Sequence, residues 1–448
     1  MPAHVIDSLF FRDLYGSAEM RAVFDDINLL QKWLDYEAAL ARAEAALGIV
    51  PPDAAEEITR KAHAALFNTD HIKQGVDKTV HPLVSLIWQL SELCEGGAGG
   101  YVHWGPTTQD VMDTALVLQI KEAYPIFERA LDELVMALSA LAQTYRDTPM
   151  AGRTHGQQAL PITFGFKVAV WLSEVKRHRA RLRDMKPRVL VGQFGGAVGT
   201  LASISEHGME INRRLMEELE LGVPDIAWHT ARDRFAEFAG AVAMIVATMG
   251  KIAHEVIDLQ KTEFGEVEEP FEMGKVGSST MPQKRNPMLC EAILALARLT
   301  RHHATTAIDA MLHEHERDWS SFQMEWAYLP ELCIMAHGAM TLTLRVISGL
   351  IVYPDNMMRN LQAGHGLLLA ERVMLTLGKH IGRQHAHDII YEAAMKAFEE
   401  RTPFAAILKD DPRVTAHLSP DTIDALLDPV QYTGLSAAYV DRVVSGNE

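Results

Sequence analysis

Apolar residues recur at helical spacing through most of the chain. Leu131, Leu134, Leu138 and Leu141 fall three and four positions apart, which places them along one stripe of a long amphipathic helix. The run 235–261 is rich in Ala, Met and Val on more than one face, so we expect a helix buried among other helices. Segments with strict alternation of apolar and polar residues are rare. The pattern therefore predicts an all-α fold.

Turn signals divide this helical pattern into three parts. The glycine-rich stretch 96–100 closes the first part, and the break at 352–356 precedes a last part with shorter helices and more prolines. We expect an N-terminal helical domain over 1–107, a central bundle of long helices over 108–350, and a C-terminal helical domain over 351–448.

Composition and charge narrow the partners. The chain has 448 residues, of which 48% are hydrophobic and 23% charged, as is ordinary for a soluble globular protein. The net charge is −17, from 59 acidic and 42 basic side chains. This balance argues against nucleic acid and against an anionic membrane surface as partners. A small anionic substrate remains possible, because a local cluster of cations can reverse the field inside a pocket.

Cysteine usage and the N-terminus indicate a cytoplasmic protein. Cys94, Cys290 and Cys333 are odd in number and scattered, which suits a reducing compartment and matches no metal-ligand spacing. Residues 1–11 lack the order of a signal peptide, and the longest apolar run, 239–250, is too short to span a bilayer.

The most informative polar segment is Gly277–Pro287. Lys284 supplies a point charge, Asn286 can donate a hydrogen bond, and Ser278 offers a small oxygen beside a glycine hinge. These groups suit a loop that holds a carboxylate and acts on the neighbouring proton. Glu291 follows the loop and can orient a histidine. The plain alternative is an ordinary polar loop between two helices.

A second polar cluster lies at residues 103–110. Thr107, Thr108 and Gln109 are expected to begin a helix, where backbone N–H groups and the threonine hydroxyls make an anion site. Simple N-capping of the helix explains the same residues, so both interpretations stay open. The glycine-rich run 192–199 lacks the glycine order of a dinucleotide loop, and we expect it to serve helix packing.

A third cluster lies at residues 152–161. His155 stands between the hydroxyl of Thr154 and the carboxamides of Gln157 and Gln158, just before a predicted helix. Histidine is the natural proton carrier near neutral pH, although a lone loop histidine is more often a surface residue.

Taken together, the three clusters resemble the active-site loops of the fumarase/aspartase superfamily. The loop 277–287 is similar to the signature segment of that superfamily, and the resemblance covers essentially the whole chain. It implies a homotetramer with a twenty-helix core, in which each active site takes one loop from each of three subunits. It also implies a small dicarboxylate substrate and neither a metal ion nor an organic cofactor.

The resemblance further implies a role for each residue in an anti β-elimination that usually releases fumarate. Ser278 would remove the proton, Lys284 and Asn286 would stabilise the enolate-like intermediate, and His155 paired with Glu291 would donate a proton to the leaving group. The substrate contacts that it implies are His103, Thr107, Thr108, Gln109, Thr154, Gln158, Ser279, Met281, Asn286 and Arg232.

The subfamily indications conflict. Segments 15–24, 228–234 and 325–330 are similar to those of bacterial 3-carboxy-cis,cis-muconate cycloisomerases. Trp326 stands where adenylosuccinate lyases usually carry an arginine that helps to bind the nucleotide, which weakens a phosphate-bearing substrate. His155 is instead typical of the eliminating lyases, because such cycloisomerases tend to carry tryptophan there.

We therefore predict a lyase that splits an N-substituted aspartate, or a similar dicarboxylate, into fumarate and an amine. A 3-carboxy-cis,cis-muconate cycloisomerase is the alternative, and adenylosuccinate lyase comes third. A catalytically silent structural relative is disfavoured, because Ser278, His155 and Lys284 are all present.

Overall fold

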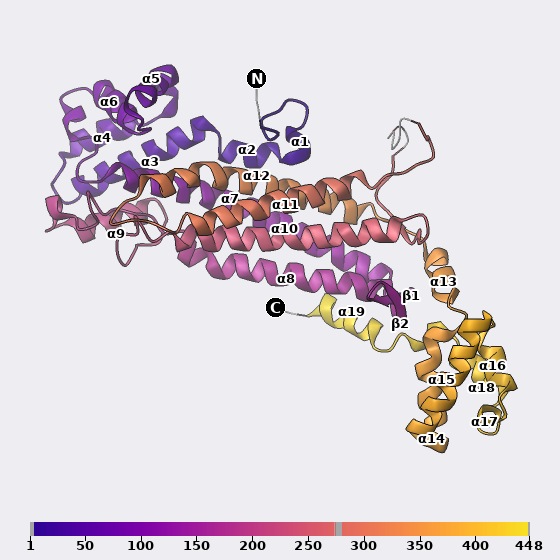
Figure 1. The fold of residues 1–448 in the computed structure, drawn as a ribbon. Helices are drawn as coiled ribbons and strands as arrows, with labels where there is room; N and C mark the ends of the chain where they lie inside the picture. Colours follow the sequence, from indigo (N-terminus) through magenta and orange to yellow (C-terminus); the bar gives the residue numbers. More distant parts are fainter. Residues whose placement is uncertain (1–3, 273, 275–279, 447–448) are drawn as a thin grey trace. The chain divides into compact units, whose positions relative to one another are not determined.

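The computed structural model describes residues 4–272, 274 and 280–446. Helices dominate the described chain, as predicted (Figure 1). The five longest are α7 (Thr108–Thr144), α8 (Phe164–Val189), α10 (Asp233–Gln260), α11 (Met288–Asp309) and α12 (Trp319–Ser348).

The chain divides into two compact units. Unit 1 comprises Met1–Leu131, His178–Met249 and Ala295–Thr341, and unit 2 comprises Asp132–Arg177, Gly250–Leu294 and Leu342–Glu448. The division falls within the five long helices. The three consecutive domains expected from turn signals remain a prediction; the first expected boundary lies at the start of α7, and the second lies between the end of α12 and β4 (Ile351–Val352).

The shorter helices are divided between the two units. Those of unit 1 are α1 (Arg12–Tyr15), α2 (Ala18–Val23), α3 (Asp26–Ala45), α4 (Pro52–Lys61), α5 (Thr69–Thr79), α6 (Val84–Leu93) and α9 (Gly208–Glu218). Those of unit 2 are α13 (Pro354–Gln362), α14 (Ala370–Ile381), α15 (Arg383–Glu400), α16 (Phe404–Asp410), α17 (Pro412–Thr415), α18 (Pro420–Leu426) and α19 (Ser436–Ser445).

The predicted apolar stripe lies on α7. Leu131, Leu134 and Leu138 are completely buried and Leu141 is half-buried, so this face of the helix forms part of the core. Helix α10 is long and apolar enough to cross a membrane by composition, but 61% of its most apolar window is buried inside the structure. That burial fits the core helix expected from the sequence.

A β-hairpin interrupts the helical pattern and was not predicted. Strand β1 (Pro149–Thr154) pairs antiparallel with β2 (Gln157–Thr163), and Thr154 lies opposite Gln157. His155 and Gly156 form the two-residue turn, with φ of 53° and 75°. Positive φ at both central residues is the mark of a type I′ turn, whose twist matches that of the paired strands. His155 therefore lies at a hairpin tip rather than in a plain loop before a helix.

A second strand pair holds the segment that leads to residues 277–287, called the signature loop below. Strand β3 (Val267–Glu268) pairs antiparallel with β4 (Ile351–Val352), which follows α12. Beyond α13, the last helices have a core of their own, in which Val373, Leu377 and Phe404 are completely buried.

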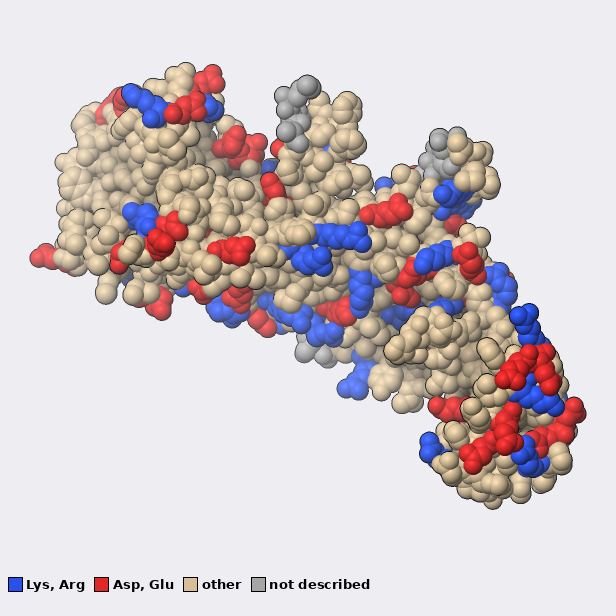
Figure 2. Space-filling view, viewed as in Figure 1, with Lys and Arg blue, Asp and Glu red and all other residues tan. Residues whose placement is uncertain are grey.

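Charged side chains of both signs are interspersed on the face drawn in Figure 2. Lys and Arg do not gather there into a broad basic tract of the kind that nucleic-acid-binding proteins use.

Candidate active site

In unit 1, the N-terminus of α7 is occupied by a carboxylate of the chain itself. The Asp110 carboxylate accepts backbone N–H groups from Thr107 at 2.9 Å, Gly195 at 3.0 Å and Gly196 at 2.9 Å, and it lies 2.7 Å from His229 Nε2. A negative charge at this position is stabilised by the helix dipole. The backbone of α7 thus supports the N-capping interpretation, and the glycine-rich run serves packing, as expected.

The hydroxyl of Thr108 faces a histidine that the sequence did not single out. Thr108 Oγ1 lies 3.0 Å from His81 Nε2, and the Leu83 N–H donates to His81 Nδ1 at 3.3 Å. With Nδ1 accepting, the proton of the neutral ring lies on Nε2, which donates to Thr108. Burial, and then the charges of His103 and Arg317, lower the pKa of His81 below its usual value. His81 is therefore a neutral hydrogen-bonding group beside the start of α7.

The pKa of His103 is shifted in the opposite direction to that of His81. Its Nδ1 lies 2.7 Å from the Glu37 carboxylate, and Glu37 on α3 is only 1% exposed. Burial alone would lower the pKa of His103, but the charge and hydrogen bond of Glu37, and then the charge of Asp110, raise it above its usual value. The cationic form of His103 is thus stabilised, and a cationic imidazole and a hydroxyl are both groups that can bind a carboxylate.

Two residues predicted to contact substrate lie in the core instead. The Gln109 amide is engaged by Arg317 at 2.8 Å and by the His229 carbonyl at 2.9 Å. Arg232 is 1% exposed and forms ion pairs with Asp113 and Glu325. A buried guanidinium needs such carboxylates to offset its lost hydration. These contacts argue against direct substrate binding by Gln109 and Arg232.

In unit 2, a buried carboxylate fixes the hairpin to the segment before the signature loop. Arg153 donates to both oxygens of Glu266, at 3.0 and 2.6 Å, and Glu266 is completely buried. Asn360 also donates to Glu266 at 2.9 Å, while Gln158 donates to the Asn360 carbonyl at 2.8 Å. Gln158 therefore braces the hairpin. His155 and Thr154 stay exposed at its tip.

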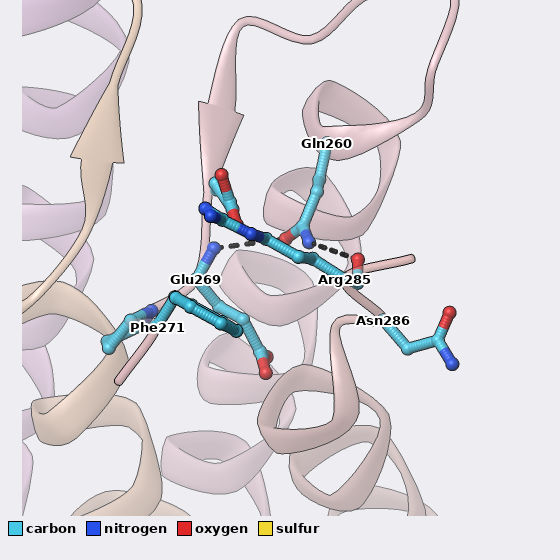
Figure 3. Close-up of a pocket in the computed structure, with 7 residues that line it drawn as sticks. Gln260, Glu269, Phe271, Arg285 and Asn286 are labelled. Atoms are coloured by element: carbon cyan, nitrogen blue, oxygen red, sulfur yellow. Dashed lines mark hydrogen bonds and ion pairs between the residues drawn. The ribbon is translucent and has the colours of Figure 1, made fainter. Parts of the chain in front are cut away.

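The end of the signature loop is anchored to β3, which directly follows Glu266. Arg285 donates to Glu268 at 2.9 Å and lies over the Phe271 ring at 3.9 Å, and Gln260 donates to the Arg285 carbonyl at 3.1 Å. The cavity between these residues measures about 10 Å³, which is roughly the space that one water molecule requires. Figure 3 shows the Asn286 side chain pointing away from this cluster. The cluster is thus an anchor rather than a substrate pocket.

A residue next to this cluster, Glu269, caps the N-terminus of α11. The Glu269 carboxylate accepts N–H groups from Leu289 at 3.0 Å and from Cys290 at 3.2 Å, and the Glu269 N–H donates to Gln260 at 3.0 Å. Because Glu269 satisfies these first-turn donors, the loop and the helix after it share one fixed base.

The remaining predicted residues lie on or near the loop. Lys284 and Met281 are exposed and belong to one turn, in which the Lys284 N–H donates to the Met281 carbonyl at 3.0 Å. Ser278 and Ser279 lie outside the described residues. Within the described chain no hydrogen bond or ion pair joins His155 to Glu291, so their pairing stays a prediction.

Glu37, His81, Glu266 and Glu268 were missed by sequence reasoning. Each lies far along the chain from the residue that it supports, and no local spacing marks it. In each unit, hydrogen bonds and ion pairs to these supporting residues hold segments that carry exposed or half-buried polar groups. In unit 2 the hairpin tip carries an exposed histidine, and the described part of the signature loop carries an exposed lysine, the residue types that proton transfer and carboxylate binding require.

Comparison with known families gives matches over most of the chain. The lyase family model matches residues 16–299, and the model of the adenylosuccinate lyase C-terminus matches residues 366–443.

Individual relatives match over nearly their full length. An N-acetyl-S-(2-succino)cysteine lyase from Dickeya dadantii is 44% identical over 99% of this chain and 98% of its own. A 3-carboxy-cis,cis-muconate cycloisomerase from Pseudomonas aeruginosa is 41% identical over 99% and 97%. The crystal structure of a fumarate lyase from Mesorhizobium sp. BNC1 superposes with a TM-score of 0.91 at 42% identity, covering 97% of this chain and 99% of its own. These findings confirm the resemblance read from the three loops, and the chain is a member of the lyase family within the fumarase/aspartase superfamily.

Proposed function

We propose that this enzyme catalyses anti β-elimination from a 2-substituted succinate and releases fumarate. The observation that carries the proposal is the 44% identity over 99% of the chain to a relative named for cleaving a succinylated cysteine. The groups of the first cluster that can bind a carboxylate, His103 with its cationic form stabilised by Glu37 and Thr108 beside His81, support a dianionic substrate.

The proposed reaction assigns a separate task to each loop. Ser278 takes the proton from the carbon beside one carboxylate, and the electron pair left on that carbon becomes the new C=C bond. Lys284 and Asn286 stabilise the charge that builds up on the carboxylate. The bond from the neighbouring carbon to the leaving atom breaks, and that atom departs with its electron pair and receives a proton from His155.

We propose sulfur as the preferred leaving atom. The sequence alone favoured an amine, but the relatives from Dickeya dadantii and from Enterococcus italicus, at 44% and 42% identity, are both named for a succinylated thiol. A thiol has a pKa of about 8.5, so its anion leaves with less help from an acid than an amine does.

We also propose that active sites are shared in a homotetramer, in the cytoplasm, without a metal ion or organic cofactor. The exposed tip of the hairpin supports sharing, because an exposed histidine with no hydrogen bond or ion pair to Glu291 within the described chain is available to another subunit. A cycloisomerase is the second candidate, favoured by the 41% identity to the Pseudomonas aeruginosa enzyme.

The decisive experiment offers the protein three substrates in parallel: N-acetyl-S-(2-succino)cysteine, an N-substituted aspartate and 3-carboxy-cis,cis-muconate. Fumarate absorbance and free thiol are followed for the first, fumarate for the second, and loss of the muconate absorbance for the third. We expect fumarate and thiol in equal amounts from the thioether. Turnover of the muconate alone would favour the cycloisomerase, and silence with all three would reject the proposal.

A further inference from the structure

A short segment of unit 2, residues 266–269, carries three carboxylates in four positions. Glu266, Glu268 and Glu269 are all buried. The Glu266 N–H donates to the Leu259 carbonyl at 2.9 Å, which fixes the start of the segment to the last turn of α10. Buried carboxylates are costly unless cations or N–H groups contact them, so the partners of each one indicate what the segment does.

The first of these carboxylates holds both strands of the hairpin close to its tip. Arg153 on β1 lies opposite Gln158 on β2, and the turn residue His155 follows two positions after Arg153. Glu266 accepts two hydrogen bonds from Arg153, at 3.0 and 2.6 Å, and one from Asn360 at 2.9 Å. The Asn360 carbonyl accepts a hydrogen bond from Gln158 at 2.8 Å. The position of His155 therefore depends on Glu266.

The second carboxylate holds the backbone between two residues that the proposed reaction uses. Glu268 accepts a hydrogen bond from Arg285 at 2.9 Å on one oxygen and from the Tyr353 hydroxyl at 2.7 Å on the other. Arg285 lies between Lys284 and Asn286 in the chain. Figure 3 shows the Arg285 side chain within the cluster and that of Asn286 pointing away from it. Glu268 therefore fixes the point from which these two neighbours extend.

The partners of the two carboxylates belong to different parts of unit 2. The side chains that donate to Glu266 lie on β1 and α13, whereas those that donate to Glu268 are Arg285 and Tyr353. Hydrogen bonds to an ionised carboxylate are about twice as strong as those between neutral groups. Removal of one carboxylate should therefore release the segment that it holds and disturb the other segment much less.

We propose that Glu266 and Glu268 are positioning residues for two different steps of the elimination. Glu266 acts through Arg153 on the transfer of a proton from His155 to the leaving atom. Glu268 acts through Arg285 on the stabilisation of the intermediate by the residues on either side of it. The proposal rests on the proposed function and deepens it. Both carboxylates are buried and act only through other residues, so neither is itself catalytic.

The first test compares two thioethers that need different help from an acid, 2-(methylthio)succinate and 2-(4-nitrophenylthio)succinate. The nitrophenyl thiolate delocalises its charge and departs with little help, whereas methanethiolate does not. Fumarate release is measured by chromatography. We expect Glu266→Gln to lower kcat by about tenfold for the methyl compound and by about twofold or less for the nitrophenyl compound, because a displaced acid slows only the step that needs it. Arg153→Lys cannot bind a carboxylate through two parallel hydrogen bonds and should show the same pattern.

Glu268→Gln should give a different result with the same two compounds. We expect kcat/KM to fall by about tenfold for both alike, because the same charge develops on the succinyl carboxylate of each. Glu263→Gln, at an exposed position three residues before Glu266, is the matched control and should change neither rate. Equal losses for the two thioethers in Glu266→Gln and in Arg153→Lys, or unequal losses in Glu268→Gln, would overturn the proposal.

Hydrogen exchange, followed by mass spectrometry, separates this proposal from the reaction itself. Glu266→Gln should speed amide exchange by about tenfold within 149–163 and leave 283–288 unchanged, whereas Glu268→Gln should do the reverse, because a lost hydrogen bond to a charged group releases the segment that it held. Wild-type protein that releases no fumarate from either thioether would reject the proposed function, and the exchange pattern would still decide whether each carboxylate holds its own segment. Exchange that rises equally in both segments, or in neither, would overturn the proposal.

Discussion

At the scale of single residues, the most informative group is Glu37. One of its oxygens holds His103, and the other is buried without a hydrogen-bond partner among the described residues. Glu44 lies two turns further along the same helix, and both of its oxygens are also buried without a partner. Burial, and then the charge of Glu37, raise the pKa of Glu44 to about 9. The arrangement keeps Glu44 protonated while Glu37 serves as the anionic partner of His103.

Replacing Glu37 by Gln should weaken substrate binding in a pH-dependent way. Without the carboxylate, the burial that lowers the pKa of His103 is no longer opposed, so His103 loses its proton at a lower pH. We expect KM for the dicarboxylate to rise most around pH 6.5, between the lowered pKa of His103 in the variant and its raised pKa in the wild type, and to change much less well below this range, where both proteins carry the cation. Initial rates against pH measure this, with the exposed Glu56→Gln as control and Glu37→Asp as partial rescue. A KM profile identical to that of the wild type would contradict the role of Glu37.

The raised pKa of Glu44 predicts that the folded protein loses stability as pH rises. Its folded pKa of about 9 lies above the usual 4.5, so the folded state retains a proton that the unfolded state releases. Stability from this group is therefore complete below about pH 4.5 and is lost as pH rises toward 9, by up to about 1.4 kcal/mol per pH unit.

Glu44→Gln removes that loss, because its amide does not ionise. We expect the difference in unfolding free energy between Glu44→Gln and wild type to shift in favour of the variant as pH rises from about 6 to about 8.5, measured by urea unfolding. The exposed Glu206→Gln should show no such shift. A difference between Glu44→Gln and wild type that stays constant with pH would contradict the protonated state.

At the scale of elements, helices could be predicted and strands could not. The stripe on α7 follows from spacing alone, because burial of one helix face repeats every three to four residues. The hairpin Pro149–Thr163 carries no alternating pattern and its turn is His-Gly rather than the favoured Asn-Gly. Its position is determined instead by Arg153 and Glu266, which lie far apart in sequence. Only the folded chain reveals that contact.

Two substitutions at the hairpin tip separate structure from chemistry. His155→Asn keeps a residue that tolerates positive φ, so the fold should remain stable while fumarate release falls by about a hundredfold or more if His155 is the acid. Gly156→Ala meets no atom within 4 Å, so its cost is the backbone strain alone, about 1 to 2 kcal/mol of unfolding free energy. Urea unfolding and fumarate absorbance measure the two effects. Full activity of His155→Asn would exclude His155 as the acid.

At the scale of the whole molecule, the sequence gives the parts of the site but not their assembly. The three polar clusters could be recognised because each concentrates charged and hydrogen-bonding residues between helical segments. The supports of those clusters, Glu37, His81 and Glu266, could not, because they become neighbours only through folding. Arg232 shows the converse, since its type suggests substrate binding while its buried ion pairs make it part of the core.

A shared site predicts complementation between two inactive variants. If His155 and Ser278 of one site come from different subunits, mixing the inactive Ser278→Ala and His155→Gln chains and allowing them to reassemble restores some intact sites. Random mixing in equal amounts should return about a quarter of the wild-type activity, because each restored site needs one intact loop from each kind of chain. Each variant reassembled alone is the control, and mixtures that stay inactive although mixed oligomers form would contradict sharing.

The most direct test of the central claim is the fumarate released from N-acetyl-S-(2-succino)cysteine by wild-type protein and by Ser278→Ala. Ultraviolet absorbance follows fumarate, and a thiol reagent counts the leaving group in the same sample. We predict one thiol per fumarate with the wild type and a rate lower by about a hundredfold or more with Ser278→Ala, because the base that starts the elimination is lost. Release of thiol without fumarate, or an undiminished rate in Ser278→Ala, would contradict the mechanism.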